Sequence, residues 1–247
     1  MTEPSLPPPA PLTEPPQPAP RPAAGNLPAS GWGPVQALTG LALLLAVTLV
    51  QVGVISAFDS DLESLGARLA VQAGLAISLV AVAFAMAPPG TIADPTTLGM
   101  RRPVVPALRP SFLAYLTYVG CAILIALAIQ PEQEDVTDQL GYGENALADV
   151  IVGMLVIGVA PFTEEVFFRG FMFAGLRHRL PFIAAAGISA GIWGLFHYTG
   201  AGTLGVVLQL AAFGVILSWL YERTGSIWPP VAVHVLNNAL AFAILTS

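Results

Sequence analysis

VIVGMLVIGVAPFTEEVFFRG, residues 150–170, is the stretch that decides the fold. Its first half contains only apolar residues and glycine, as expected for a membrane-crossing helix, which needs about 20 predominantly apolar residues. Its second half adds Glu164, Glu165 and Arg169. Ionisable side chains inside membrane helices are costly and usually mark a functional site. The stretch therefore predicts a helical membrane protein with a polar site inside the bilayer.

The composition of the whole chain supports the same class. Of its 247 residues, 55% are hydrophobic and only 10% are charged, which is far more apolar than a soluble domain. The formal net charge is −6, so we expect no nucleic-acid partner. The single cysteine, Cys121, excludes an intrachain disulfide and a cysteine-cluster metal site. We expect an all-α, polytopic protein embedded in a lipid bilayer.

Seven apolar runs are long enough to cross a bilayer. They cover residues 35–57, 66–87, 111–130, 148–176, 182–199, 203–222 and 228–246. The fourth run is long and contains Pro161, so we expect it to be kinked or tilted. Before the first run, residues 1–34 hold 12 of the 23 prolines and too few apolar residues to pack a core. This tail is expected to be disordered.

Arginines occupy alternate loops between the predicted spans. They are Arg101, Arg102 and Arg109 after the second span, Arg177 and Arg179 after the fourth, and Arg223 after the sixth. The other loops are acidic or uncharged. Because arginine-rich loops stay in the cytoplasm, the alternation predicts a multi-pass protein of the cytoplasmic (inner) membrane. Its N-terminus would be cytoplasmic and its C-terminus outside.

Polar residues from three predicted spans reach a similar depth. We count residues from the cytoplasmic end of each span, at about 1.5 Å per helical residue. Glu164 then lies roughly 20 Å deep, His197 roughly 24 Å, His234 roughly 16 Å and Asn238 roughly 22 Å. The sequence therefore predicts one polar cluster in the membrane, contributed by the fourth, fifth and seventh spans.

Helical geometry separates the two adjacent glutamates. Glu165 and Arg169 are four residues apart and share a face, so we expect them to pair. Glu164 lies about 140° around the helix from Arg169, which would leave its carboxylate free. His234 and Asn238 are also four residues apart and share a face.

This cluster suits hydrolysis of a peptide bond by water. A carboxylate such as Glu164 can act as a general base, and His197 can help it to hold a water. His234 and Asn238 can donate hydrogen bonds to a developing oxyanion. Glu164, His197 and His234 could instead hold a zinc ion with a bound water, and the sequence leaves both versions open. In the simplest alternative, these polar side chains only join helices.

Three motifs in this order resemble those of the CAAX-protease and bacteriocin-processing (CPBP, or Abi) family of membrane proteases. They are EEVFFR at 164–169, WGLFH at 193–197 and HVLNN at 234–238. They match EExxxR, an aromatic residue four positions before a histidine, and HxxxN; here Trp stands where the family often has Phe. The resemblance implies a catalytic core over residues 147–247, with residues 35–146 as accessory helices and loops.

The resemblance also implies a role for each matched residue. The first glutamate would activate the attacking water, with the histidine of the second motif as its partner. The second glutamate and the arginine would support the site. The third motif would stabilise the oxyanion, or its histidine would bind a metal. The implied catalytic residues are Glu164, Glu165, Arg169, His197, His234 and Asn238.

The resemblance predicts an intramembrane endopeptidase acting on a peptide or a membrane protein. A transporter that uses midplane Glu and His is a second hypothesis, and a non-catalytic bacteriocin-immunity protein of the same fold is a third. Ser189 lies in GISAG, but no strand precedes it as a nucleophile elbow requires. Gly187 and Gly191 around it are expected to support close helix packing as a GxxxG pair.

Overall fold

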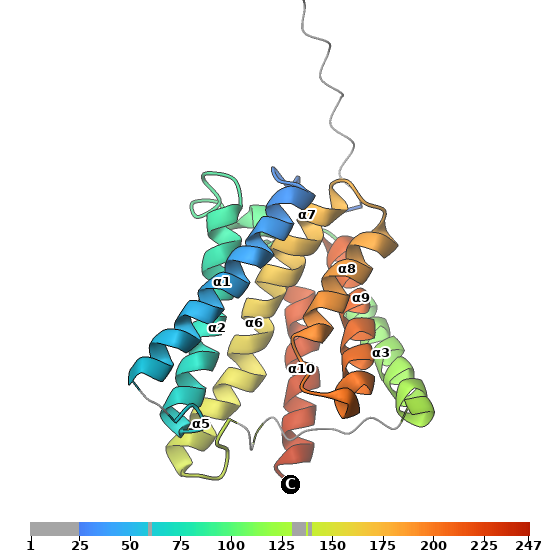
Figure 1. Cartoon of the computed structure of the whole chain (residues 1–247). Helices are drawn as coiled ribbons and strands as arrows, with labels where there is room; N and C mark the ends of the chain where they lie inside the picture. The colour runs from blue at the N-terminus through green and yellow to red at the C-terminus, as the bar shows by residue number, and fades with distance from the viewer. Residues whose placement is uncertain (1–24, 59–60, 130–136, 138–139) are drawn as a thin grey trace, which may run out of the picture.

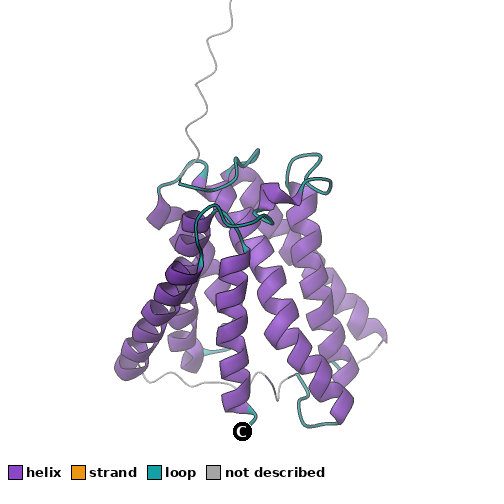
Figure 2. Cartoon of the chain, turned by 180° about the vertical axis from the view of Figure 1, so that it is seen from behind, coloured by secondary structure: helices purple, strands orange, loops and turns teal. Residues whose placement is uncertain are grey.

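The computed structural model describes residues 25–58, 61–129, 137 and 140–247. Within these ranges every regular element is helical (Figures 1 and 2). The elements are α1 (Pro34–Phe58), α2 (Leu65–Met86), η1 (Pro95–Leu98), α3 (Leu108–Ile129), α5 (Ala146–Met154), η2 (Leu155–Val159), α6 (Ala160–Glu164), η3 (Glu165–Phe173), α7 (Ala174–Arg177), α8 (Phe182–Leu195), η4 (Ala201–Thr203), α9 (Leu204–Thr224) and α10 (Trp228–Leu245). The predicted all-α class is therefore confirmed.

Successive membrane helices run in opposite directions, so the described chain enters the bundle at one end and finishes at the other (Figure 1). Six of them are long and apolar enough to cross a membrane, and α8 is a shorter apolar helix of 14 residues. The chain is thus a multi-pass membrane protein, and each of the seven predicted runs contains one helix or one helical span.

The fifth span is shorter than predicted, because α8 ends at Leu195 rather than near residue 199. The chain turns over the next residues. There the Thr203 hydroxyl oxygen accepts hydrogen bonds from the backbone N–H groups of Thr199, at 3.2 Å, and Gly200, at 3.3 Å. The turn satisfies backbone groups that a longer helix would have paired internally.

The fourth span is one continuous helical rod whose hydrogen-bond pattern changes along its length. It runs from Ala146 to Arg177 through α5, η2, α6, η3 and α7, and η2 and η3 are π-helical. Pro161 lies in the first turn of α6, directly after η2. A proline has no N–H for the helical ladder, and π-helical turns are frequent at functional sites. The sequence predicted a kink or tilt because of Pro161, and the structure has π-helical turns on either side of it. Glu164 ends α6 and Glu165 begins η3, so both glutamates lie at that junction.

Side chains from other parts of the chain bond to backbone carbonyls of these π-helical turns. The indole N–H of Trp32 donates to the Phe171 carbonyl at 2.9 Å, and the Ser189 hydroxyl donates to the Phe168 carbonyl at 2.8 Å. Ser189 is therefore a buried structural donor, consistent with its rejection as a nucleophile. The π-helical segment η3 is held by residues that lie far from it in sequence.

The segment just before α1 is packed against the bundle. Residues 1–24 lie outside the described residues, but residues 25–33 were also assigned to the tail by sequence. In this segment Leu27 and Trp32 are buried, and Asn26 donates through its side-chain amide to the Arg223 carbonyl at 2.7 Å. The boundary predicted at residue 34 thus lies too late, because a few apolar and amide side chains suffice to anchor a short proline-containing segment.

A loop between α2 and α3 closes over the π-helical turn. A Cβ atom on Gly170 would lie only 2.6 Å from the Leu98 carbonyl oxygen, so only glycine fits at this position. Arg101, three residues on, donates to the carbonyls of Asn26 and Gly225, at 2.7 Å each. Residues 98–101 of the loop between α2 and α3 therefore pack against the segment that carries the glutamates and against neighbouring backbone.

We expect Gly170→Ala to lower the free energy of unfolding by about 1–3 kcal/mol, the usual cost of overpacking a core. The new methyl group would meet the Leu98 backbone, which cannot rotate away as a side chain can. Gly158→Ala is the matched control on the same span, because nothing lies within 4 Å of a Cβ atom there. Thermal unfolding in detergent measures both; equal melting temperatures would contradict the contact.

Helices α8 and α9 approach closely through glycines other than the predicted pair. A Cβ atom on Gly194 would lie 2.7 Å from the Val207 carbonyl, and one on Gly214 would lie 2.6 Å from the Ala190 Cβ. At Gly187 and Gly191 nothing lies within 4 Å of a Cβ atom, so the GxxxG interpretation was wrong. Spacing alone did not reveal which face of α8 meets its neighbour.

Candidate active site

A buried three-residue network forms the base of the site. The Arg169 guanidinium donates to Glu165 Oε1 at 2.8 Å, which confirms the predicted pairing along one helix face. The same oxygen accepts a hydrogen bond from His234 Nδ1 at 3.0 Å. Glu165 and Arg169 are 0% and 1% exposed, so the charge of each is compensated inside the protein. The first and third motifs meet through this carboxylate.

Glu164 has a different environment from its neighbour. Its side chain is 16% exposed, and its Oε2 accepts a hydrogen bond from the indole N–H of Trp193 at 2.7 Å. The Nε2 atom of His234 lies 3.9 Å from the same oxygen. We see no hydrogen bond to Oε1 from any residue that the structure describes. One carboxylate oxygen is thus fixed while the other is available, as the helical angle indicated.

His197 lies in the turn after α8. Its Nδ1 is 3.0 Å from the Trp193 carbonyl, and because a carbonyl only accepts, Nδ1 carries the proton. Its ring also contacts the Trp193 indole edge to face, at 5.6 Å between centroids. Within the described ranges no hydrogen bond joins His197 to Glu164. The hydrogen bond leaves Nε2 of the neutral ring with a free lone pair.

Asn238 lies on α10 one turn after His234. Its side-chain amide donates to the Val156 carbonyl at 2.9 Å, on the π-helical turn η2. An asparagine amide has two N–H donors, so this bond leaves a second donor. The bond ties α10 to the fourth span beside the buried network.

Trp193 is the site residue that sequence reasoning missed as a functional group. In the sequence it stands out only as the residue in place of phenylalanine in the second motif. In the structure it is 1% exposed, and its ring contacts the His197 and His234 rings. The Arg169 guanidinium carbon lies 4.6 Å from the indole centroid, within the range of a cation–π contact. The available signal was the indole N–H, which phenylalanine lacks.

The side chains present do not form a zinc site. A bound zinc ion needs three or four ligands converging at about 2.0–2.3 Å from one point. Within the described parts of the chain, no group of three or more His, Cys, Asp or Glu side chains has that arrangement. His197 and Glu164, two of the three ligands considered from the sequence, each contact Trp193 instead. We therefore derive no chemical step through a metal.

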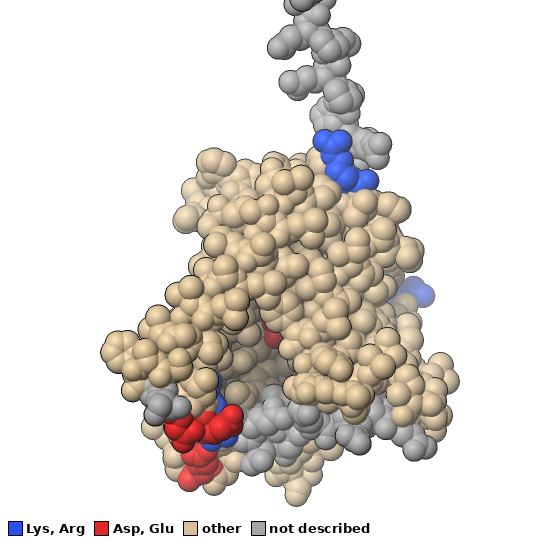
Figure 3. All heavy atoms as spheres, viewed as in Figure 1, with Lys and Arg blue, Asp and Glu red and all other residues tan. Residues whose placement is uncertain are grey.

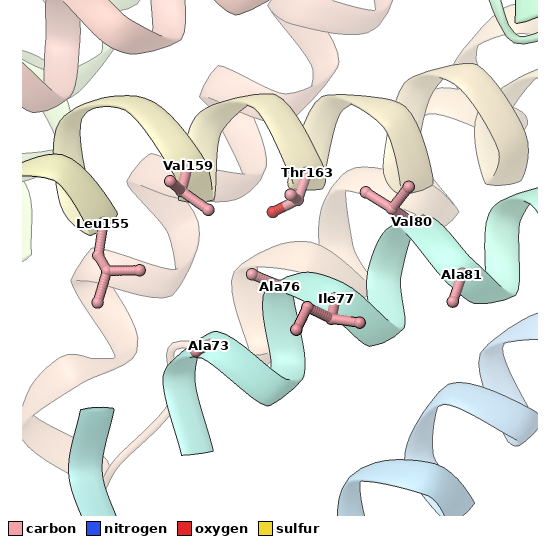
Figure 4. Close-up of a pocket in the computed structure, with 8 residues that line it drawn as sticks. All are labelled: Ala73, Ala76, Ile77, Val80, Ala81, Leu155, Val159 and Thr163. Atoms are coloured by element: carbon pink, nitrogen blue, oxygen red, sulfur yellow. The ribbon is translucent and has the colours of Figure 1, made fainter. Parts of the chain in front are cut away.

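An apolar cavity of about 450 Å³ lies beside the fourth span (Figure 4). Its walls come from α2 and from the segment between Leu155 and Thr163, the residue before Glu164. The lining residues are Ala73, Ala76, Ile77, Val80, Ala81, Leu155, Val159 and Thr163. Figure 3 shows that one face of the molecule is hollowed between the helices, with acidic atoms deep in the hollow. The fold therefore offers apolar space next to the glutamate segment.

Comparisons with known proteins agree on the same part of the chain. Residues 146–240 match the family described as type II CAAX prenyl endopeptidase Rce1-like. A Bacillus subtilis (strain 168) protein named "Putative membrane peptidase YdiL" is 34% identical over 99 residues. That match covers 38% of this chain and 39% of the relative.

No solved structure matches the chain. The family match begins at the first residue of α5 and ends within α10, so it contains all three motifs. The first and third motifs share the buried network, and the second motif contacts both of them through Trp193. Residues 146–240, less than half of the chain, are therefore similar to the CAAX protease and bacteriocin-processing family of membrane proteases.

Proposed function

We propose that the protein is an intramembrane endopeptidase that hydrolyses a peptide bond with a water activated by Glu164. The observation that carries this proposal is the partly exposed carboxylate of Glu164, which one hydrogen bond fixes at Oε2 while Oε1 is available for a water. A carboxylate held in this way, in a site with little water, suits a general base. The similarity of residues 146–240 to a protease family supports the same reaction.

The proposed reaction uses the described side chains in distinct roles. Glu164 takes a proton from the water as its oxygen attacks the carbonyl carbon. The C–N bond breaks, and the proton passes to the leaving amine. His197, whose Nδ1–H is bound to a carbonyl, presents Nε2 as an acceptor that helps to orient the water. These steps leave a new carboxyl terminus and a new amino terminus.

The third motif would stabilise the oxyanion in this proposal. His234 contacts Glu165 through Nδ1, and its Nε2, 3.9 Å from Glu164 Oε2, faces the Glu164 side of the site, where an N–H at this atom would be the first donor. The free N–H of Asn238 is the second donor, since its other N–H is bound to Val156. Arg169 holds the Glu165 side chain in place through the 2.8 Å ion pair. Hydrogen bonds aimed at developing charge are usually the largest single contribution to catalysis.

The cavity between α2 and the fourth span favours a substrate with an apolar part that lies in the bilayer. We propose that this cavity receives that part, while the scissile bond lies at Glu164. The arginine-rich ends of the helices would face the cytoplasm of the inner membrane, with the N-terminus inside and the C-terminus outside.

Cleavage by the purified protein in detergent tests the function directly. Peptides and single-span membrane proteins are incubated with wild type, with Glu164→Ala and with His197→Ala, each with and without a chelator. In ¹⁸O-labelled water, mass spectrometry should find one labelled oxygen in the new carboxyl terminus. Cleavage by Glu164→Ala would refute the mechanism, and loss on chelation reversed by zinc would require a metal. Solute flux in liposomes that depends on Glu164, without any cleavage, would favour a transporter. If the protein shows neither cleavage nor flux, the result would favour a non-catalytic protein.

Filling the cavity should weaken substrate binding. We expect Ala73→Phe to raise KM on the order of tenfold, which corresponds to about 1.4 kcal/mol of binding free energy, with kcat within twofold. Ala73 is only partly buried, so a larger side chain has room to enter the cavity. Ala128→Phe, on the exposed face of α3, is the matched control. An unchanged KM in the Ala73 variant would place the substrate elsewhere.

A further inference from the structure

Trp193, in the second motif, contacts residues of the first and third motifs as well as the histidine of its own motif. Its indole N–H bonds to Glu164 of the first motif, and its ring contacts His234 of the third at 5.3 Å between centroids. Its own carbonyl accepts from His197 of the second motif. A residue that only filled space would not need the indole N–H that bonds to Glu164.

The hydrogen bond to Glu164 fixes the rotation of the carboxylate. The indole is 1% exposed and lies under the Arg169 guanidinium, so it cannot swing toward solvent. An indole nitrogen only donates, and here it binds Oε2 at 2.7 Å. With Oε2 occupied, Oε1 is the oxygen that can take a proton. The carboxylate is therefore held with one oxygen committed and one available.

The same tryptophan fixes the neighbouring histidine. The Trp193 carbonyl accepts from His197 Nδ1 at 3.0 Å, so it selects the tautomer whose Nε2 is unprotonated. A carbonyl at this position would be present with any residue, but the indole ring packed on the imidazole also sets its orientation. One side chain and its backbone thus orient both groups that would share the water.

We propose that Trp193 is a positioning residue, whose indole N–H orients the Glu164 carboxylate for water activation. This inference rests on the proposed function, because it assigns Trp193 a role in that reaction. The indole donates to the base and does not touch the substrate. Phenylalanine, which keeps most of the ring and loses the N–H, would leave Oε2 without this donor.

Trp193→Phe should lower kcat by roughly 10–100-fold with KM within about threefold, as expected for a lost hydrogen bond to a charged group. Trp219→Phe is the matched control, because Trp219 lies on α9 and is 40% exposed. The control should keep wild-type kcat, and both variants should keep a wild-type melting temperature within a few degrees. A Trp193→Phe variant with kcat within twofold of wild type would overturn the proposal.

Indole resonances report on the contact independently of cleavage. In ¹⁵N-labelled protein, the Trp193 indole N–H signal is assigned by its loss in Trp193→Phe. In Glu164→Ala the Trp193 signal should move further than those of the other three tryptophans. An unmoved signal would overturn the inference even where wild type cleaves well. If no substrate is cleaved, or if Glu164→Ala stays active, the proposed function fails. The shift of the Trp193 indole signal in Glu164→Ala still decides whether Trp193 contacts and positions Glu164.

Discussion

Glu164→Gln is expected to reduce cleavage by about 10²–10⁴-fold in kcat, the range by which a positioned general base accelerates a reaction. The glutamine side chain has nearly the shape of glutamate and its amide oxygen can still accept from Trp193, so the fold and the substrate site should survive. KM should therefore stay near the wild-type value. Initial rates over a range of substrate concentrations, in detergent, give both constants.

Glu222→Gln is the matched control for this substitution. Glu222 bonds to Arg177 at 2.9 Å near the end of the bundle, away from the glutamate site, and its side chain is 17% exposed, close to the 16% of Glu164. The two variants thus make the same chemical change in carboxylates of similar exposure. A similar rate loss in both would show that the effect comes from general destabilisation, and full activity of Glu164→Gln would exclude Glu164 as the base.

Arg169→Met should have the largest effect on stability, lowering the free energy of unfolding by about 3–5 kcal/mol. The Glu165 carboxylate is fully buried and would lose the only described cation that compensates it, other than a protonated His234. Removing one partner of a buried ion pair leaves an uncompensated charge in an apolar interior. Denaturation in detergent, monitored by loss of helix signal, measures the change.

The matched control is Arg177→Met on the same span. Arg177 pairs with Glu222, but both side chains are partly exposed, at 20% and 17%, so solvent can replace the interaction. Pairs of this kind contribute about 0–1 kcal/mol. Adding Glu165→Gln to Arg169→Met removes the unpaired charge and should restore part of the stability without restoring activity. Equal losses from the two arginine variants would contradict the buried network.

The fold class was predictable because composition and apolar run length determine it in a bilayer. Every described helix of span length coincides with a predicted run to within a few residues. The end of α8 was not predictable in this way, since the length of an apolar run does not tell where a helix gives way to a turn. The turn that follows is held by the Thr203 hydroxyl, which accepts from the backbone N–H groups of Thr199 and Gly200, a contact that appears only once the turn is folded.

The sequence predicted which helices contribute to the site, but it predicted fewer of the individual side-chain contacts. Spacing of four residues correctly paired Glu165 with Arg169. Depth counting brought Glu164 near His234, and the two side chains lie 3.9 Å apart. It also gave His197 a depth similar to that of Glu164, and the described contacts of His197 are with Trp193. The catalytic roles of these residues stay predictions.

The rest depends on long-range contacts that no local pattern encodes. Gly170 is required because a carbonyl from the loop at Leu98 lies against it, more than 70 residues earlier in the chain. Trp32 bonds to η3 from a proline-containing segment that composition alone assigned to a disordered tail. Whether a tryptophan donates a hydrogen bond or only fills space likewise depends on its neighbours in the fold. Trp193 is a donor because Glu164 lies beside its indole N–H.

The early end of α8 has a consequence for how water reaches a site inside a membrane. A helix of 14 residues covers about 21 Å, whereas the hydrocarbon core is about 30 Å thick. The turn that carries His197 therefore lies below the far surface of the bilayer, and Tyr198 within it is half exposed. Lipid-exposed irregular backbone does not occur in the hydrocarbon region, so we expect the exposed side of this turn to meet water. Such access would supply the reactant that the proposed hydrolysis consumes.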